Sequence, residues 1–150
     1  MSQSLVKVNL HIVFSTKYRK DWIQNDISGE VYSYLVSIGK DCGSFVYKIG
    51  GTKNHIHIAC TLPKTITVSS LLEHYKTSSS KWIKTKGSDY SDFAWQNGYA
   101  AFSVGQSQID TLIKYINNQH VHHHKKTFEE ELVELFKVYN VEYDEKFLWD

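Results

Sequence analysis

Apolar side chains alternate with other residues at the start of the chain. From Val6 to Phe14, every second position is apolar. A two-residue period of this length is typical of a strand with one face in a core. Apolar residues then recur at helical spacing from Ile23 to Ile38, and Gly39 is a favourable residue to end a helix. We therefore expect a strand followed by a helix.

The next segment predicts a β-hairpin. Residues 44–50 and 53–62 have strand character, and the pair Gly50-Gly51 indicates the turn between them. Pro63 follows directly and ends the second strand, because proline cannot donate a backbone hydrogen bond.

A second helix and a fourth strand are predicted after the hairpin. Thr67 or Ser69 can cap the helix, whose apolar positions continue to Ile83. Residues 87–98 have loop composition, and residues 99–104 then have strand character.

Two capping boxes predict two helices in the last third of the chain. Ser107 with Asp110 opens a helix that ends at about Gln119, and Thr127 with Glu130 opens another. In such a box, two side chains satisfy backbone N–H groups that the first helical turn leaves without partners.

The predicted order is strand, helix, strand, strand, helix, strand, and then two helices. This order is that of the ferredoxin-like, or split βαβ, α+β fold, a four-stranded antiparallel sheet with helices on one face. The C-terminal helices then cover either the open face of the sheet or a second subunit. We expect a single domain over residues 1–150, with a core at about 4–105 and a C-terminal helix and tail at about 106–150.

Composition excludes several classes of protein. The chain has 150 residues with one proline and eight glycines, which argues against collagen-like or long disordered structure. Its longest apolar stretches are strand-sized, too short to cross a bilayer, and the N-terminus lacks signal-peptide features. We therefore expect a cytoplasmic protein. Cys42 and Cys60 have no CxxC spacing and are expected to be reduced.

Charge is distributed unevenly along the chain. Residues 1–88 carry 12 Lys and Arg against 5 Asp and Glu, whereas residues 89–150 carry 5 against 11. Lysines suit phosphate contacts, and interleaved aromatic residues suit unpaired bases. The candidate DNA-binding residues are the cations of the basic stretches, Lys17, Arg19, Lys20, Lys53, Lys76, Lys81 and Lys84.

Two short patterns carry candidate chemistry. His55 and His57 flank Ile56 on a predicted strand, so both imidazoles point to one face, where they can bind a divalent cation. Tyr115 and Gln119 are four residues apart on a predicted helix and share a face. A tyrosine hydroxyl beside a metal-bound phosphate can act as a nucleophile, and a glutamine oxygen can complete a metal site. Ordinary packing roles are the alternative for both patterns.

A histidine cluster follows the predicted tyrosine helix. His120, His122, His123 and His124 have no cysteine nearby and no ligand spacing of a known structural zinc site. We therefore expect a polar segment there and no dedicated metal site.

The chain as a whole resembles one family. The matching segments are HIVFSTKYRK (11–20), GGTKNHIHIACTLPKT (50–65), SSSKWI (78–83), FAWQNGYAAFSV (93–104), KYINNQ (114–119), and HHHKKTFEEEL through EYDEKFLWD (122–150). In this order they are similar to TnpA-like single-tyrosine HUH transposases of small bacterial insertion sequences, which include REP-associated tyrosine transposases.

The resemblance implies an activity and a set of roles. His55, His57 and Gln119 would hold Mg²⁺ or Mn²⁺, and Tyr115 would attack single-stranded DNA at hairpin-marked element ends. The intermediate would be a 5′-phosphotyrosine link with a free 3′-OH, which is later rejoined without a nucleotide cofactor. The resemblance also implies a homodimer in which the active sites can be shared between subunits.

Other functions stay open at this point. A catalytically silent relative acting as a nucleic-acid-binding module is one alternative, because four-stranded sheets of this kind also bind RNA. A histidine-rich metal store is another. The sequence does not distinguish a self-mobilising element from a housekeeping relative.

Overall fold

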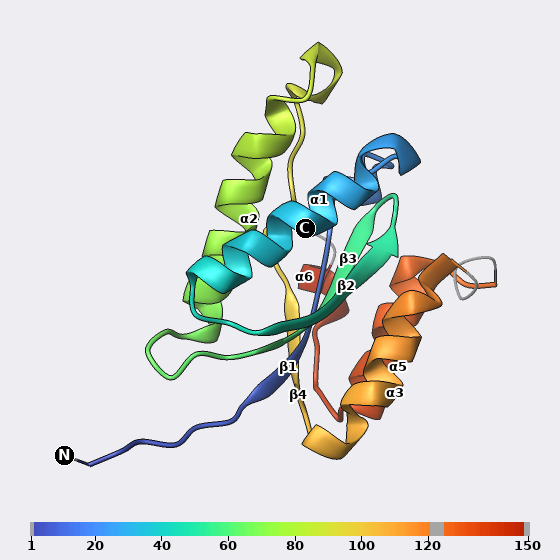
Figure 1. Ribbon diagram of the computed structural model, residues 1–150. Helices are drawn as coiled ribbons and strands as arrows, with labels where there is room; N and C mark the ends of the chain where they lie inside the picture. Colours follow the sequence, from blue (N-terminus) through green and yellow to red (C-terminus); the bar gives the residue numbers. More distant parts are fainter. Residues whose placement is uncertain (1, 121–124, 149–150) are drawn as a thin grey trace.

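The computed structural model describes residues 2–120 and 125–148, and its centre is one antiparallel sheet (Figure 1). The sheet has the strand order β2-β3-β1-β4. Its strands are β1 (Asn9–Ser15), β2 (Val46–Thr52), β3 (His55–Thr61) and β4 (Ala100–Val104). This is the predicted α+β arrangement, with β1 paired antiparallel to both β3 and β4.

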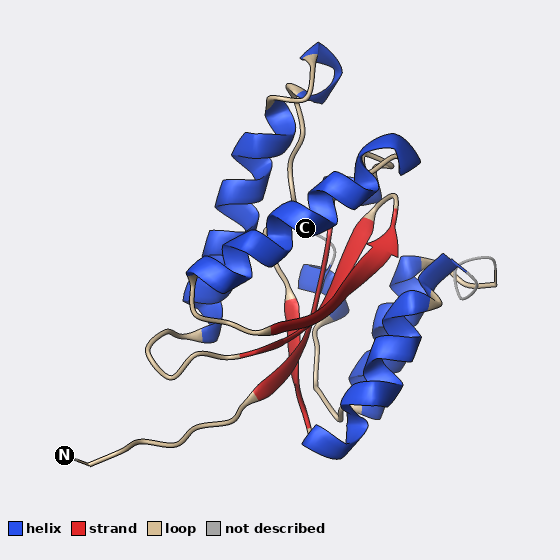
Figure 2. Ribbon diagram, viewed as in Figure 1, coloured by secondary structure: helices blue, strands red, loops and turns tan. Residues whose placement is uncertain are grey.

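Two long helices cover one face of the sheet. They are α1 (Asn25–Asp41) and α2 (Val68–Lys84), and both lie on the same side of the strands (Figure 2). Their apolar residues and those of alternate strand positions form the largest core cluster, which includes Leu10, Ile12, Phe14, Val31, Leu35, Ile56, Ile58, Leu71, Leu72 and Ile83.

The C-terminal helices cover the opposite face of the sheet. Helix α3 (Ile109–Asn117) packs on β2 and β3, and α5 (Phe128–Val138) packs on β1 and β4 (Figure 2). A short helix, α6 (Glu145–Leu148), follows. Of the two positions expected for these helices, the structure thus shows the open face of the sheet.

The pair Gly50-Gly51 does not form the hairpin turn, which corrects the prediction. Both residues lie inside β2, and the turn is at residues 53–54. A Cβ on Gly50 would lie 2.8 Å from Cγ2 of Ile116 on α3, and one on Gly51 would overlap the His55 carbonyl oxygen. These glycines therefore permit close approach of neighbouring backbone.

Two further boundary predictions were wrong. Helix α1 runs through Gly39 to Asp41, and the left-handed residue after it is Gly43, with φ of 87°. Ser107 lies in a 3₁₀ turn, η3 (Gln106–Gln108), and no side chain caps α3 at Gln108. The tight turn therefore takes the place of the predicted capping box.

Two predicted helix caps were confirmed. The capping box of Thr127 and Glu130 opens α5, and the Thr67 hydroxyl caps α2 by accepting from the backbone N–H of Ser70 at 3.1 Å. Both cysteines are free of disulfides. Among the described residues, no helix has the length and apolar character needed to cross a membrane.

Candidate active site

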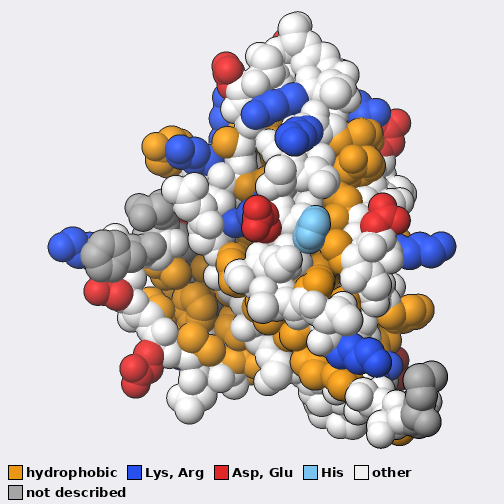
Figure 3. Space-filling view, turned by 90° about the vertical axis from the view of Figure 1, so that its left-hand side faces the viewer, with side chains coloured by type: hydrophobic (Ala, Val, Ile, Leu, Met, Phe, Trp, Pro, Cys, Tyr) orange, Lys and Arg blue, Asp and Glu red, His pale blue; other side chains and the backbone are white. Residues whose placement is uncertain are grey.

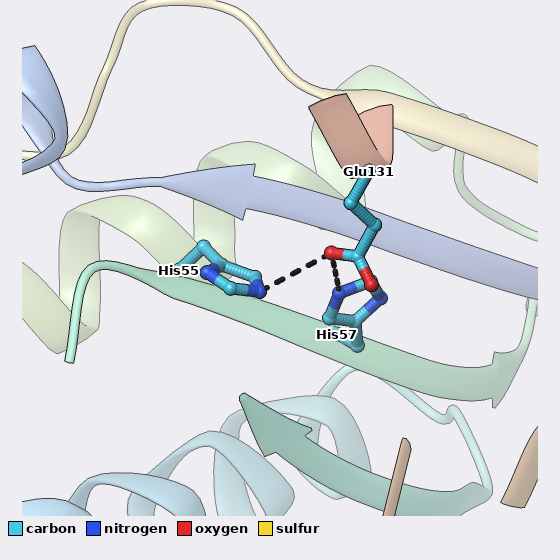
Figure 4. A group of neighbouring side chains, drawn as sticks. All are labelled: His55, His57 and Glu131. Atoms are coloured by element: carbon cyan, nitrogen blue, oxygen red, sulfur yellow. Dashed lines mark hydrogen bonds and ion pairs between the residues drawn. The ribbon is translucent and has the colours of Figure 1, made fainter. Parts of the chain in front are cut away.

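The predicted histidine pair lies beneath the C-terminal helices. Alternation along β3 turns His55 and His57 toward α3 and α5, while Ile56 between them enters the core under α1 and α2. Both imidazoles are completely buried. Their rings lie side by side and face a carboxylate on α5 (Figure 4).

That carboxylate belongs to Glu131, which has an exposed fraction of 2%. One oxygen, Oε1, lies 3.1 Å from Nε2 of His57 and 3.4 Å from Nε2 of His55 (Figure 4). A buried carboxylate is costly unless charges and hydrogen bonds compensate it. Glu131 therefore depends on the polar groups that surround it.

The predicted residues of the tyrosine helix reach the same place. Oε1 of Gln119 lies 2.9 Å from Nε2 of His55, and the Gln119 amide donates to Oε2 of Glu131 at 2.9 Å. The Tyr115 hydroxyl donates a hydrogen bond to the same Glu131 oxygen. The structure thus brings His55, His57, Tyr115 and Gln119 together and adds Glu131 to them.

The surroundings keep the Tyr115 hydroxyl protonated. Burial is the main cause that raises the pKa of Tyr115, and the adjacent Glu131 charge raises it further. The site therefore holds a neutral phenol next to a carboxylate. Positive charge near Glu131 would weaken that second effect.

The hydrogen bonds of His55 indicate that the site fits a cation. Nδ1 of His55 lies 2.8 Å from Oδ1 of Asn54, an oxygen that can only accept, and 2.9 Å from the Thr52 hydroxyl, which can donate or accept; in the tautomer that satisfies Asn54, Nδ1 is the donor. In the neutral ring, the Nε2 lone pair then faces Oε1 of Gln119, whose amide orientation is fixed by its bond to Glu131. Two acceptors facing each other are satisfied by a cation between them, and imidazole with oxygen ligands is a common metal set.

The candidate metal-binding group in the structure includes Glu131 beside the predicted residues. One ligand atom from each of His55, His57 and Glu131 lies within 4.8 Å of the others. Gln119 lies beside this group, where its Oε1 contacts Nε2 of His55. Sequence reasoning missed Glu131, although a signal existed: it occupies the apolar stripe of α5 with Phe128, Leu132 and Leu135, where an unpartnered carboxylate would be destabilising.

The candidate DNA-binding cations fall into two groups. The residues Lys17, Arg19, Lys20 and Lys53 lie at one end of the sheet, in η1 (Lys17–Arg19), the residue after it, and the turn before His55. The backbone N–H of Ile23 donates to the Lys53 carbonyl at 2.8 Å and joins the two segments. This group lies next to the strand end that bears the histidines.

The second group lies on α2, on the face of the sheet opposite to α3 and α5 (Figure 2). Lys81 and Lys84 are exposed there, and Figure 3 shows basic side chains toward the upper end of this side of the molecule. Lys76 differs, because its ammonium donates to the carbonyl oxygens of Gln96, Asn97 and Gly98 at 2.6–3.3 Å. It ties α2 to the loop before β4, and burial lowers the pKa of Lys76 to about 8.

The histidine cluster is only partly placed. His120 is exposed, just after α3, and residues 122–124 lie outside the described part of the chain. The expectation that they hold no metal therefore stays a prediction.

Comparison with known proteins identifies the family. The family model of IS200-like transposases matches residues 4–119, which include the histidine pair, the tyrosine and the glutamine. The chain belongs to the IS200-like transposase family. In this transposase, α5 and Glu131 lie beyond the matched segment. No match was found among curated protein sequences.

Solved structures support the same fold. A protein of Deinococcus radiodurans R1 proposed to be a transposase has a TM-score of 0.62 at 16% identity, covering 79% of this chain and 98% of that one. A REP-associated tyrosine transposase bound to a REP hairpin has a TM-score of 0.61 at 16% identity, covering 82% of this chain and 74% of that one.

Proposed function

We propose that this transposase cuts and rejoins single-stranded DNA through a covalent bond between Tyr115 and a 5′ phosphate. One observation carries the proposal: a tyrosine hydroxyl, a carboxylate and two imidazole nitrogens converge in a buried cluster formed by one chain. Such a set supplies a nucleophile, an acceptor for its proton and metal ligands in one place. A binding module that only stacks bases has no need of this set.

The protein groups account for the proton. Tyr115 donates its hydrogen bond to Oε2 of Glu131, so that oxygen is the first acceptor when the phenol attacks. The bond between Tyr115 Oη and phosphorus forms, and the bond from phosphorus to the 3′ oxygen breaks. The proton then passes from Glu131 to the 3′ oxygen, which leaves as a 3′-OH. Attack by a 3′-OH reverses these changes and frees Tyr115.

His55, His57 and Glu131, with Gln119, would hold the Mg²⁺ or Mn²⁺. When bound, the cation supplies polarisation of the scissile phosphate and offsets the negative charge beside Tyr115. The mixed nitrogen and oxygen ligand set suits manganese, and carboxylate and carbonyl oxygens suit both ions.

The substrate has room to approach the nucleophile. A cavity of about 420 Å³ lies between the end of β4, α3 and α5, and its lining includes Tyr115, Leu112, Gln108 and His11. The basic group that includes Lys17, Arg19, Lys20 and Lys53 would bind phosphates of the same strand, and Lys81 and Lys84 would extend the contact on α2. A hairpin as the DNA partner is suggested by the REP hairpin in the similar REP-associated transposase.

The tyrosine acts in cis in this proposal, because Tyr115 reaches the histidine pair of its own chain. The homodimer implied by resemblance to the family is a separate proposal. Light scattering tests it: a species of about twice 17.4 kDa is expected, and a species of 17.4 kDa would contradict it.

A denaturing gel tests the proposed chemistry. Wild-type protein and Tyr115→Phe are incubated with single strands from the flanks of the gene, with Mg²⁺, Mn²⁺ or EDTA. The wild type is expected to form an adduct that survives denaturation and requires the metal, while Tyr115→Phe forms less than about 10⁻⁴ as much. An adduct of Tyr115→Phe, or none with the wild type on any flanking strand, would contradict the proposal.

A further inference from the structure

A third buried histidine contacts the site from β1. His11 is completely buried, and its ring is tilted by 26° from the plane of the His57 ring, with centroids 5.1 Å apart. Nε2 of His11 lies 2.8 Å from Nδ1 of His57, and Nδ1 of His11 lies 3.2 Å from the Tyr139 hydroxyl. A continuous chain of hydrogen bonds therefore runs from Tyr139 through His11 to His57.

We propose that His11 and Tyr139 are positioning residues that hold His57 in the tautomer needed to bind a metal ion. This inference rests on the proposed function, in which Nε2 of His57 is a ligand. Metal-bound imidazoles commonly donate their other N–H to a partner that fixes tautomer and ring orientation. Asn54 supplies such a partner to His55, and His11 supplies it to His57.

The tautomer of His57 determines the tautomer of His11. If Nε2 of His57 offers its lone pair to a metal, then Nδ1 carries the hydrogen and donates to Nε2 of His11. His11 is then a neutral ring with its own hydrogen on Nδ1, which donates to the Tyr139 oxygen.

The Tyr139 hydroxyl, at the end of this chain of hydrogen bonds, has a specific advantage. In the absence of metal, Nε2 of His57 can instead carry the hydrogen and donate to Glu131, 3.1 Å away. The chain then runs in the opposite direction, and Tyr139 donates where it previously accepted. Because a hydroxyl does both, His11 stays satisfied in either direction, while the number of protons on the chain stays the same.

Tyr139→Phe isolates this effect from packing. The Tyr139 ring stacks on Phe102 with centroids 4.2 Å apart, and phenylalanine preserves that stack. Tyr143→Phe is a matched control, since Tyr143 stacks on Phe136 in the same C-terminal segment and lies outside the chain of hydrogen bonds. His11→Phe removes the acceptor itself and keeps an aromatic ring.

Metal titration by calorimetry without DNA is the first measurement. We expect Tyr139→Phe to bind Mn²⁺ about 10-fold more weakly than wild type, His11→Phe up to about 100-fold more weakly, and Tyr143→Phe with unchanged affinity. Unchanged affinity of Tyr139→Phe would overturn the proposal. Equal losses in Tyr139→Phe and Tyr143→Phe would also overturn it, because they would indicate a general loosening of the tail.

A spectroscopic measurement reads the tautomers directly. In ¹⁵N NMR spectra of the histidine rings at saturating Mg²⁺, His11 and His57 are both expected to carry hydrogen on Nδ1. A His11 ring with hydrogen on Nε2 would overturn the proposal, since it could not accept from His57. If the wild type binds metal but forms no DNA adduct, the proposed function is contradicted. The roles of His11 and Tyr139 in positioning His57 are then unaffected.

Discussion

The two faces of the seven-residue strand β3 carry different side chains, apolar on one face and histidine on the other. Ile56 and Ile58 enter the apolar core beneath α1 and α2, whereas His55 and His57 face Glu131 beneath α3 and α5. All four strand residues are completely buried. The difference therefore lies in the chemistry of the partners and not in access to water.

Each face makes a different contribution to the molecule. Burial of apolar surface on the first face stabilises the fold, by roughly 25 cal/mol per Å² removed from water. On the second face, buried polar groups are desolvated and require mutual pairing to offset that cost. Substitutions on the first face should therefore change stability, and substitutions on the second should change activity.

The largest expected effect is on the apolar face. Leu72→Ala removes a side chain with an exposed fraction of 1% and should lower the free energy of unfolding by about 3 kcal/mol. Urea unfolding measures this. The rate of adduct formation per folded molecule should match the wild type, and a specific loss of rate would contradict the separation of the two faces.

On the polar face, Glu131→Gln should have the opposite pattern. The rate of adduct formation is expected to fall roughly 100-fold, because a metal ligand and the proton acceptor of Tyr115 are both weakened. The unfolding midpoint should be equal to or above that of the wild type, since a buried carboxylate is removed. A variant that is fully active, or one that unfolds readily, would break the comparison.

Gly50→Ala tests the contact between strand β2 and the helix that bears Tyr115, where a packing change should affect both stability and activity. Its Cβ would lie 2.8 Å from Cγ2 and 3.0 Å from the backbone oxygen of Ile116, the residue after the tyrosine. We expect a shift of α3, a loss of about 1–3 kcal/mol and a roughly 10-fold slower adduct formation. Gly29→Ala, which meets no atom within 4 Å, is the control and should leave the rate unchanged.

The smallest expected effect concerns DNA contact at the end of the sheet. Lys53→Ala should weaken single-strand binding a few-fold and reduce the slope of log K against log salt by about 0.7. Fluorescence anisotropy at several salt concentrations measures both quantities. Lys40→Ala, about 25 Å away at the other end of α1, is the control, and an equal effect of both variants would argue for nonspecific attraction.

The sequence predicts the arrangement of the strands and most of the site because both depend on short periods. Alternation along β3 predicts the shared face of the two histidines, and helical spacing predicts that of Tyr115 and Gln119. The structure agrees on both points. Local capping chemistry also predicts the start of α5 correctly.

The remaining features depend on contacts between distant segments. Glu131 meets the histidines only because α5 folds back on the sheet, and His11 meets Tyr139 across 128 residues. Gly50 and Gly51 suggest a turn when considered locally, whereas their role depends on the approach of α3 and of the β3 backbone. No local period contains this information.

The most direct test of the central claim is to locate the covalent bond. The metal-dependent adduct is digested with nuclease and trypsin, and the nucleotide-bearing peptide is sequenced by mass spectrometry. The phosphotyrosine is expected on Tyr115, the single tyrosine of tryptic peptide 115–125. A nucleotide on any of the other nine of the ten tyrosines would contradict the account.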